Sequence, residues 1–278
     1  MGRESNAQSE IPAQQSVAPH ALALFRILIG AVLVSVWTLA MFQEAALSVG
    51  EWMLCIGMVL MAVFIIIGAW LRYIAAIMAL LYVLEFALMQ AAGTETNLVT
   101  NVEQAAFFFP ALLLLAWSNA DRAFSHAMHL RYGSALEWED VRALPVNALK
   151  ILVASAYLYI GTYVLWQPVW MSGVRLRSAL LGSLGTKLGA QLALSAVPPW
   201  LFQWKLYSIK AFVLMLPFCL WIRSVRALCI GLGLILHMTA VVLIGKWWLL
   251  ALASGMALFI DPEKIRMHAE ARFGKKTA

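Results

Sequence analysis

Two ionisable residues lie deep inside long apolar stretches of the sequence, where a side chain that exchanges protons needs a specific purpose. Glu85 stands between Leu84 and Phe86, and His237 stands in the run LILHMTAVV. A carboxyl group in such surroundings must be protonated or paired. If Glu85 and His237 met, they could bind a ligand such as a quinone or handle a proton. The structural alternative for His237 is a neutral imidazole that is hydrogen-bonded to another helix.

Basic residues also fall within the apolar stretches. Arg26, Lys150 and Lys210 each lie near the predicted start of one, so we expect their long side chains to reach the membrane surface. Lys210 is also a candidate for the wall of a cavity. His126 and His129 are three residues apart but have no third ligand nearby, so we predict no metal site. The sequence contains no GxSxG, P-loop, HExxH or GxGxxG motif, and it leaves the catalytic residues unknown.

The composition around these residues is that of a membrane protein. Hydrophobic residues make up 63% of the chain and charged residues 12%, and the mean hydropathy is +0.83. An average soluble domain has roughly 25% charged residues. These values argue against a soluble enzyme, a disordered chain and a DNA-binding protein. The net charge of +6 is explained by basic loops beside a membrane, so membrane lipid is the expected partner and nucleic acid is not.

The apolar runs predict an all-α, polytopic integral membrane helix bundle of about eight transmembrane helices. Each run comes near the roughly 20 residues that a membrane span needs. The predicted spans are 21–42, 52–70, 73–92, 104–119, 147–166, 206–222, 225–244 and 246–261. They form one membrane domain, 21–261, between a polar N-terminal tail, 1–20, and a basic C-terminal tail, 262–278.

The distribution of Lys and Arg predicts the orientation of the bundle. With eight spans, thirteen of these residues fall on the side of both termini and five on the other side. Positively charged loops stay in the cytoplasm, so we expect a plasma (inner) membrane protein with both termini cytoplasmic. The long outer segment 167–205 is glycine-rich and amphipathic. We favour an interfacial or re-entrant helix there; a full span would reverse every later segment.

Tryptophans gather near the predicted span ends, where these side chains anchor membrane proteins at the interface. They are Trp52, Trp70, Trp117, Trp166, Trp170, Trp200, Trp204, Trp221, Trp247 and Trp248. Interfacial anchoring is the expected role of most of them.

The order of several motifs resembles one family. The motifs are FRILIG (25–30), ADRAFSHAM (120–128), the stretch 149–182, and the late span with His237 followed by an aromatic pair. Together they resemble the HTTM family, the membrane domain related to vitamin K-dependent γ-carboxylase and distantly akin to DoxX-like, quinone-associated proteins. The resemblance covers roughly residues 20–260 and implies an HTTM-like bundle.

The resemblance also bears on individual residues. The family pattern after the fifth span is matched by Tyr157, Tyr159, Gly161, Trp170 and Gly173. The lysine of that pattern, which looks like the base of the carboxylases, is replaced by Val164. Valine cannot take up a proton, so we do not expect vitamin K-dependent carboxylation.

The resemblance implies a function closer to that of short bacterial family members, which resemble a membrane component needed to mature or export a secreted antimicrobial peptide. The chain would bind a peptide, lipid or quinone in an outward-facing cavity lined by Tyr159, Trp166 and Trp170, and would assist maturation or export of a small secreted peptide. The alternative is a quinone-linked membrane oxidoreductase of DoxX-like type, using Glu85 and His237. A transporter ranks third, because the sequence shows no convincing inverted halves.

Overall fold

The structure, a computed structural model, describes most of the helical part of the chain. The described ranges are 19–43, 48–92, 102–120, 142–166, 168, 174–181, 185–195, 198–245 and 247–260. Every regular element in these ranges is a helix, which confirms the all-α prediction. The tail predicted over 262–278 and nearly all of that over 1–20 lie outside the described residues, as do His126, His129 and Trp170.

Helices occupy all eight of the predicted positions. They are α1 (Pro19–Gln43), α2 (Val49–Ile67), α3 (Leu71–Ala92), α4 (Val102–Trp117), α6 (Ala143–Tyr159) with the π-helix η1 (Ile160–Val164), α10 (Pro199–Trp221), α11 (Arg223–Ile244), and α12 (Leu249–Gly255) with the 3₁₀-helix η2 (Met256–Phe259). Five stretches are long and apolar enough to cross a membrane: Ala21–Phe42, Val49–Ile67, Ala143–Tyr163, Trp200–Trp221 and Arg223–Ile244. The chain therefore has the helices of a multi-span membrane protein.

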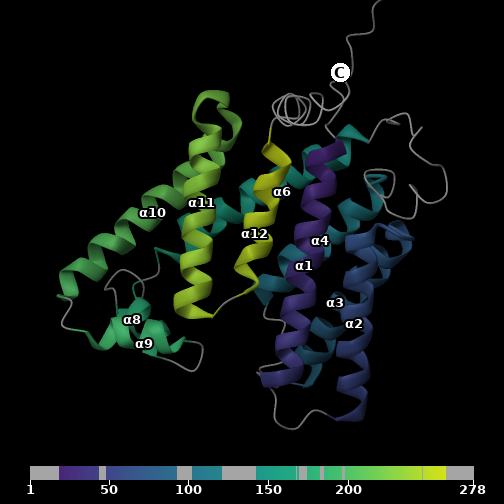
Figure 1. Ribbon diagram of the computed structural model, residues 1–278, viewed down its shortest axis with the longest axis horizontal. Coiled ribbons are helices and arrows are strands. Elements are labelled where there is room, and N and C mark those ends of the chain that lie inside the picture. The colour runs from purple at the N-terminus through teal and green to yellow at the C-terminus, as the bar shows by residue number, and fades with distance from the viewer. Residues whose placement is uncertain are drawn as a thin grey trace, which may run out of the picture.

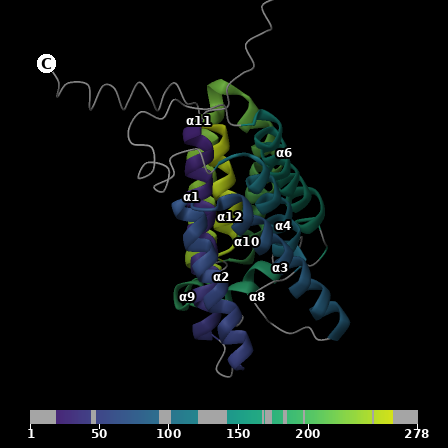
Figure 2. The same ribbon diagram turned by 90° about the vertical axis from the view of Figure 1, so that its right-hand side faces the viewer.

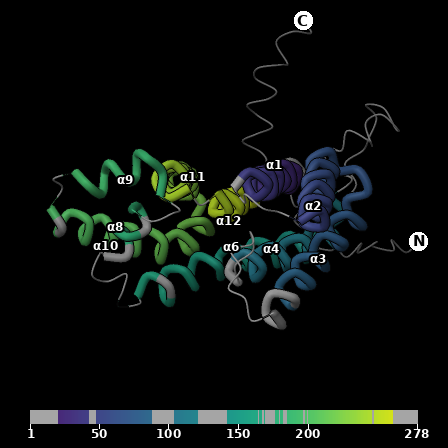
Figure 3. The backbone as a smooth tube through the Cα atoms, turned by 90° about the horizontal axis from the view of Figure 1, so that it is seen from below, coloured from purple at the N-terminus to yellow at the C-terminus, as the bar shows by residue number. Residues whose placement is uncertain are grey.

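The last predicted span, 246–261, is a short core helix. The apolar helix covers only Leu249–Phe259, about 16 Å at 1.5 Å per residue, whereas the hydrocarbon core of a bilayer is about 30 Å thick. Every residue from Ala251 to Phe259 is buried, and α12 packs on α1, α11 and α6. Figure 3 shows α12 between α1 and α11. The residues of this helix are apolar because they pack against other helices of the protein.

The long helices run up and down the bundle. The start of α1, the turn between α10 and α11, and the end of η2 lie at one end, and two short helices lie at the other (Figures 1 and 2). The short helices are α8 (Val174–Leu181) and α9 (Lys187–Leu194). We call these the turn end and the α8–α9 end.

The segment 167–205, which the distribution of Lys and Arg predicts to lie outside, contains no spanning helix among its described residues. It holds the two eight-residue helices α8 and α9 and the first residues of α10. The described residues therefore give no support to a full span, and the interfacial or re-entrant position stays a prediction. Helix α10 begins at Pro199, seven residues before the predicted span at 206. Proline is favoured in the first turn of a helix, and this was the missed signal.

Helix α9 is fastened to the end of α11. The Thr186 hydroxyl donates to the Val242 carbonyl over 2.7 Å, and the Thr186 N–H donates to the Leu243 carbonyl over 3.2 Å. These bonds satisfy carbonyls that the last turn of a helix leaves without partners. A Cβ atom on Gly189 would overlap the Leu243 carbonyl, so only glycine permits this approach.

The tight turn from α2 to α3 depends on Gly68. This residue ends α2 in the left-handed conformation with φ +80°, which glycine adopts without strain. A Cβ atom there would lie 2.5 Å from the guanidinium of Arg26. Arg26 is fully buried, and its Nη1 donates to the Ala120 carbonyl over 2.7 Å. The expectation that Arg26 reaches the membrane surface is therefore wrong; it joins α1 to the end of α4.

Candidate functional site

Glu85 lies on α3, one turn after Tyr82, and both of its carboxyl oxygens are enclosed. Tyr82 is buried, accepts a hydrogen bond from Trp37 Nε1 over 3.1 Å, and stacks on Phe108 with 5.3 Å between ring centroids. Glu85 thus lies one helical turn from a packed aromatic cluster contributed by α1, α3 and α4.

His237 is held by two hydrogen bonds in the core between α11 and α6. Its Nδ1 lies 2.7 Å from the Gly233 carbonyl oxygen. A carbonyl only accepts, so Nδ1 carries the proton and the Nε2 of the neutral ring is an acceptor. The buried Tyr157 hydroxyl lies 3.2 Å from Nε2 and donates to it. This is the structural alternative stated for His237, a neutral imidazole hydrogen-bonded to another helix.

The structure does not bring Glu85 and His237 together. Helix α3 packs on α4 and α2, whereas α11 packs on α10, α12 and α9. Helices α1 and α12 lie between them in the view of Figure 3. A single site that uses both side chains therefore has no basis in this arrangement.

Lys210 lies at the centre of α10 and is buried. It is the twelfth of 23 residues in the helix, so the expectation that it lies near a span start and reaches the surface is wrong. Its Nζ is 5.5 Å from the Trp166 ring centroid and 5.4 Å from that of Tyr207. A lysine in a membrane-spanning helix costs about 2.5–3.5 kcal/mol, and a cation–π contact with a partly exposed ring returns about 0.5–1 kcal/mol. The two rings, which are about half exposed, therefore offset part of that cost.

Tyr159 lines a pocket between four helical elements. The pocket has a volume of about 230 Å³ and is lined by Ala106 and Phe107 of α4, Leu152, Ser155, Ala156 and Tyr159 of α6, Ile160 of η1, Trp248, and Leu252 of α12. We call it the Tyr159 pocket. It lies toward the α8–α9 end, since Ala106 is near the start of α4, Tyr159 ends α6, and Trp248 precedes α12.

The π-helix η1 separates the surroundings of Tyr159 and Trp166. The Leu165 N–H donates to the Ile160 carbonyl, five residues back, over 3.0 Å. Such wide turns add a residue to a helix and are frequent at functional sites. Tyr159 before η1 lines the pocket beside α4 and α12, and Trp166 after it contacts Lys210 on α10. The cavity predicted for both residues is thus divided between two places.

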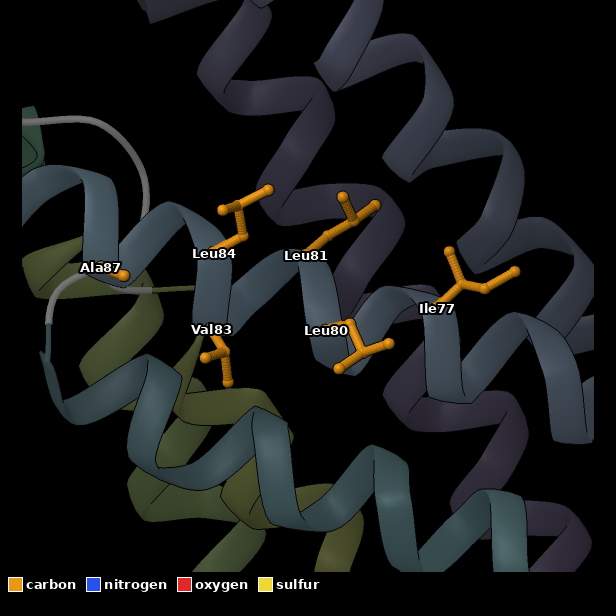
Figure 4. A pocket seen from close by; sticks show the side chains of 6 residues that line it. All are labelled: Ile77, Leu80, Leu81, Val83, Leu84 and Ala87. Carbon is orange, nitrogen blue, oxygen red and sulfur yellow. The ribbon is translucent and has the colours of Figure 1, made fainter.

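A second hollow, of about 430 Å³, runs along the outer face of α3 (Figure 4). Its lining residues all belong to this one helix: Ile77, Leu80, Leu81, Val83, Leu84 and Ala87. Most of these side chains are exposed, as expected for a face that meets lipid tails. Glu85 is not among the lining residues. This hollow is an open apolar surface, and none of its lining side chains is polar.

Trp248 is the pocket residue that sequence reasoning assigned to another role. It was expected to be an interfacial anchor, but it is 7% exposed, whereas its neighbour Trp247 is 40% exposed. The Trp248 Nε1 is buried and has no hydrogen-bond partner among the described residues. Adjacent tryptophans before a short apolar helix were the available signal, but the sequence does not show which of the two turns inward.

The remaining predicted residues cannot be placed in a site. Trp170 and Gly173 lie outside the described residues, and the side chain of Val164 does too. No cluster of three or more His, Cys, Asp or Glu that could hold a metal occurs among the residues that the structure describes.

Comparisons with protein-family models, with curated proteins and with solved structures found no match to this chain.

Proposed function

We propose that the protein binds a membrane amphiphile, a lipid or a quinone, in the Tyr159 pocket and thereby assists the maturation or export of a small secreted peptide. The observation that carries the binding step is the pocket itself. It is bounded by four helical elements, and six of its nine lining side chains are alanine, leucine, isoleucine or phenylalanine. Sites for small ligands have this apolar character with a few polar groups among the walls.

The volume of the pocket favours a small ligand over a peptide. Pockets for drug-sized ligands measure roughly 300–1,000 Å³. At about 230 Å³, the Tyr159 pocket holds a ring or a short length of acyl chain. A peptide exceeds this volume. We therefore propose that the amphiphile occupies the pocket and that a peptide contacts the protein elsewhere.

The position of the pocket supports access from the membrane and from the outer side. Tyr159 is 51% exposed, so one wall opens to the surroundings of the bundle. The pocket lies toward the α8–α9 end, which the distribution of Lys and Arg assigns to the outside. A ligand bound there would lie on the side on which a secreted peptide is released.

The peptide role rests on the resemblance to the HTTM family. Within that proposal the protein is a non-carboxylase member of this family in a bacterial inner membrane. Val164 in place of the family lysine supports the absence of carboxylation. The quinone-linked oxidoreductase gains no support from the described residues, because Glu85 and His237 occupy separate parts of the bundle.

The first experiment identifies molecules that co-purify with the full chain in mild detergent, by mass spectrometry. We expect a stoichiometric lipid or quinone. Ala106→Phe would fill the pocket from the α4 wall and remove this ligand. Ala211→Phe is the matched control, because Ala211 is exposed on α10 and does not line the pocket.

Two outcomes would overturn the binding proposal: no retained amphiphile in the unmodified protein, or equal retention in both variants. The peptide role is tested separately in cells. Deleting the protein should abolish the mature form of a secreted peptide, and restoring it with the Ala106→Phe variant should fail to recover that form. Normal peptide secretion in the deletion strain would contradict the role in maturation or export.

A further inference from the structure

A cluster of two basic and two aromatic side chains lies at the turn end of the bundle. Helix α6 contributes Lys150 and the end of α10 contributes Trp221. The first turn of α11 contributes Arg226, and η2 contributes Phe259. Helix α10 packs on α6 and α11, and η2 packs on both α6 and α10, so these elements meet at this end (Figure 1). We call the four side chains the turn-end cluster.

Direct contacts connect the members of the turn-end cluster. The Lys150 Nζ lies 5.8 Å from the centroid of the Phe259 ring. The Phe259 ring meets that of Trp221 edge to face, with 5.6 Å between centroids. The Arg226 Nε donates to the Leu220 carbonyl over 2.8 Å, and its Nη2 donates to the Trp221 carbonyl over 3.3 Å. These bonds hold the guanidinium at carbonyls that the end of α10 leaves without helical partners.

The charges of the cluster have one sign. Lys150 Nζ forms no hydrogen bond or ion pair with a described residue, and the nearby charge of Arg226 repels it. The described acidic residues lie elsewhere: Glu51 and Glu103 begin α2 and α4 at the α8–α9 end, and Glu85 lies in the second half of α3. A negatively charged ligand would relieve the repulsion between the two basic groups.

A ligand can reach the cluster from outside the protein. Lys150 and Arg226 are both half-buried, with part of each side chain exposed. Lys150 Nζ has no hydrogen-bond partner among the described residues, yet it is not one of the enclosed atoms without a partner, so this nitrogen is accessible. The Trp221 ring beside it is 52% exposed. An oxygen atom of a ligand can therefore approach Lys150 Nζ directly.

The surroundings of the cluster favour a phospholipid as the source of this negative charge. Three stretches that are long and apolar enough to cross a membrane have an end here: Ala143–Tyr163, Trp200–Trp221 and Arg223–Ile244. The distribution of Lys and Arg assigns the turn end to the cytoplasm, where the leaflet carries anionic lipids. Basic pockets between spanning helices on that side bind lipid headgroups. Phosphate oxygens accept strong hydrogen bonds from both lysine and arginine.

We infer that Lys150 and Arg226 together bind the phosphate group of an anionic phospholipid beside the exposed ring of Trp221. This site is separate from the Tyr159 pocket, which lies toward the α8–α9 end, so the inference does not depend on the proposed function. Soluble inorganic phosphate presents the same oxygen atoms, and the experiment below separates the two sources.

The test measures binding to the full-length protein in mild detergent by native mass spectrometry. The probes are a short-chain phosphatidylglycerol and a phosphatidylcholine with the same acyl chains. Both present a phosphate, but only the first carries a net negative charge. We expect the unmodified protein to bind phosphatidylglycerol at least about fivefold more tightly, the equivalent of about 1 kcal/mol for a basic residue beside an anionic lipid. Equimolar inorganic phosphate should not displace the lipid.

Lys150→Met removes the charge and keeps an unbranched side chain beside the Phe259 ring. We expect it to bind phosphatidylglycerol about fivefold more weakly and phosphatidylcholine as before. Lys150→Arg retains the charge and should keep the preference for phosphatidylglycerol. Arg142→Gln is the matched control, because Arg142 is exposed at the same end of the bundle but lies eight residues before Lys150, about 12 Å along the helix axis.

A second measurement separates ligand binding from a purely structural role of Lys150. Without lipid, the thermal unfolding midpoint of Lys150→Met should equal or exceed that of the unmodified protein, because the repulsion with Arg226 is gone. Added phosphatidylglycerol should raise the midpoint of the unmodified protein more than that of the variant. A lower midpoint without lipid, with an unchanged increase on adding lipid, would show a structural role and contradict the inference.

Equal binding of the two lipids by the unmodified protein would overturn the inference, whether or not the variants fold. Equal weakening by Lys150→Met and Arg142→Gln would overturn it too, since it would show only a general attraction to a basic end. Displacement of phosphatidylglycerol by equimolar inorganic phosphate would assign the cluster to soluble phosphate and overturn the lipid source. Loss of the preference in Ala106→Phe would place the anionic lipid in the Tyr159 pocket instead.

Discussion

The bond between Tyr157 and His237 joins α6 to α11 through two side chains that the bundle encloses. The His237 ring is fixed from both sides, by Gly233 on its own helix and by Tyr157 across the interface. Their rings also meet edge to face, with 5.7 Å between centroids. Such a pair fixes the position of one helix against the other and leaves neither imidazole nitrogen free to bind a ligand.

Tyr157→Phe should therefore lower stability without removing ligand binding. The substitution deletes the donor to His237 Nε2 and leaves a buried acceptor unsatisfied, at a cost of about 1–3 kcal/mol. The thermal unfolding midpoint in detergent measures this loss. Tyr163→Phe is the control, because Tyr163 is exposed and lies only six residues further along the chain. An equal midpoint for the two variants would show that the Tyr157 hydroxyl contributes nothing.

Two glycines of the α2 region should respond in opposite ways to alanine. Gly68→Ala places a side chain at φ +80° and against the Arg26 guanidinium, so we expect a loss of at least about 1–2 kcal/mol. Gly57 lies inside α2, and a Cβ atom there would have no neighbour within 4 Å, so Gly57→Ala should be neutral or stabilising by up to about 1 kcal/mol. Both are measured as unfolding midpoints. A tolerated Gly68→Ala would contradict the placement of Arg26.

Among the elements, α8 and α9 show how a segment too short to span can still be fixed in place. Thr186 caps the start of α9 by accepting from the Gly189 N–H over 3.1 Å, and it also donates to the end of α11. Arg177 of α8 donates to the Ala193 carbonyl near the end of α9 over 3.2 Å. Leu180, Ala193 and Phe202 form a small core beneath these helices.

Gly189→Ala should loosen this element and leave the long helices intact. The added Cβ would meet the Leu243 backbone, which cannot move without disturbing the end of α11. We expect faster amide hydrogen exchange across Lys187–Leu194 and unchanged exchange in α1 and α2. Gly231→Ala on α11 is the control, because its Cβ would meet nothing within 4 Å. Unchanged exchange in α9 would show that the helix does not dock as described.

At the scale of the whole molecule, hydropathy predicted the position of every long helix that the structure describes but not the surroundings of each one. The run at 246–261 is as apolar as a span because protein encloses it, and hydropathy cannot separate protein from lipid as the apolar neighbour. Trp247 and Trp248 are chemically identical, yet one is exposed and the other buried. Glu85 and His237 lie at similar predicted depth but in different parts of the bundle, which only tertiary packing determines.

The orientation of the bundle is the last property that the sequence predicts and that cells can test. Ser195 is exposed at the α8–α9 end, and Ser224 is exposed at the turn end. Each is replaced singly by cysteine in a chain whose native Cys55, Cys219 and Cys229 are replaced by serine. A membrane-impermeant maleimide should label Ser195→Cys in intact cells and Ser224→Cys only after permeabilisation.

The basis of this expectation is the excess of Lys and Arg on the turn side. Labelling of both positions in intact cells would indicate that the altered chain is not properly inserted. Folding of the altered chain is checked by comparing the amount of ligand that it retains with the amount retained by the protein with its native cysteines. The reverse pattern would place the α8–α9 end in the cytoplasm. The Tyr159 pocket would then open toward the cytoplasmic side, and its proposed position on the side where a secreted peptide is released would be wrong, although binding of an amphiphile would be unaffected.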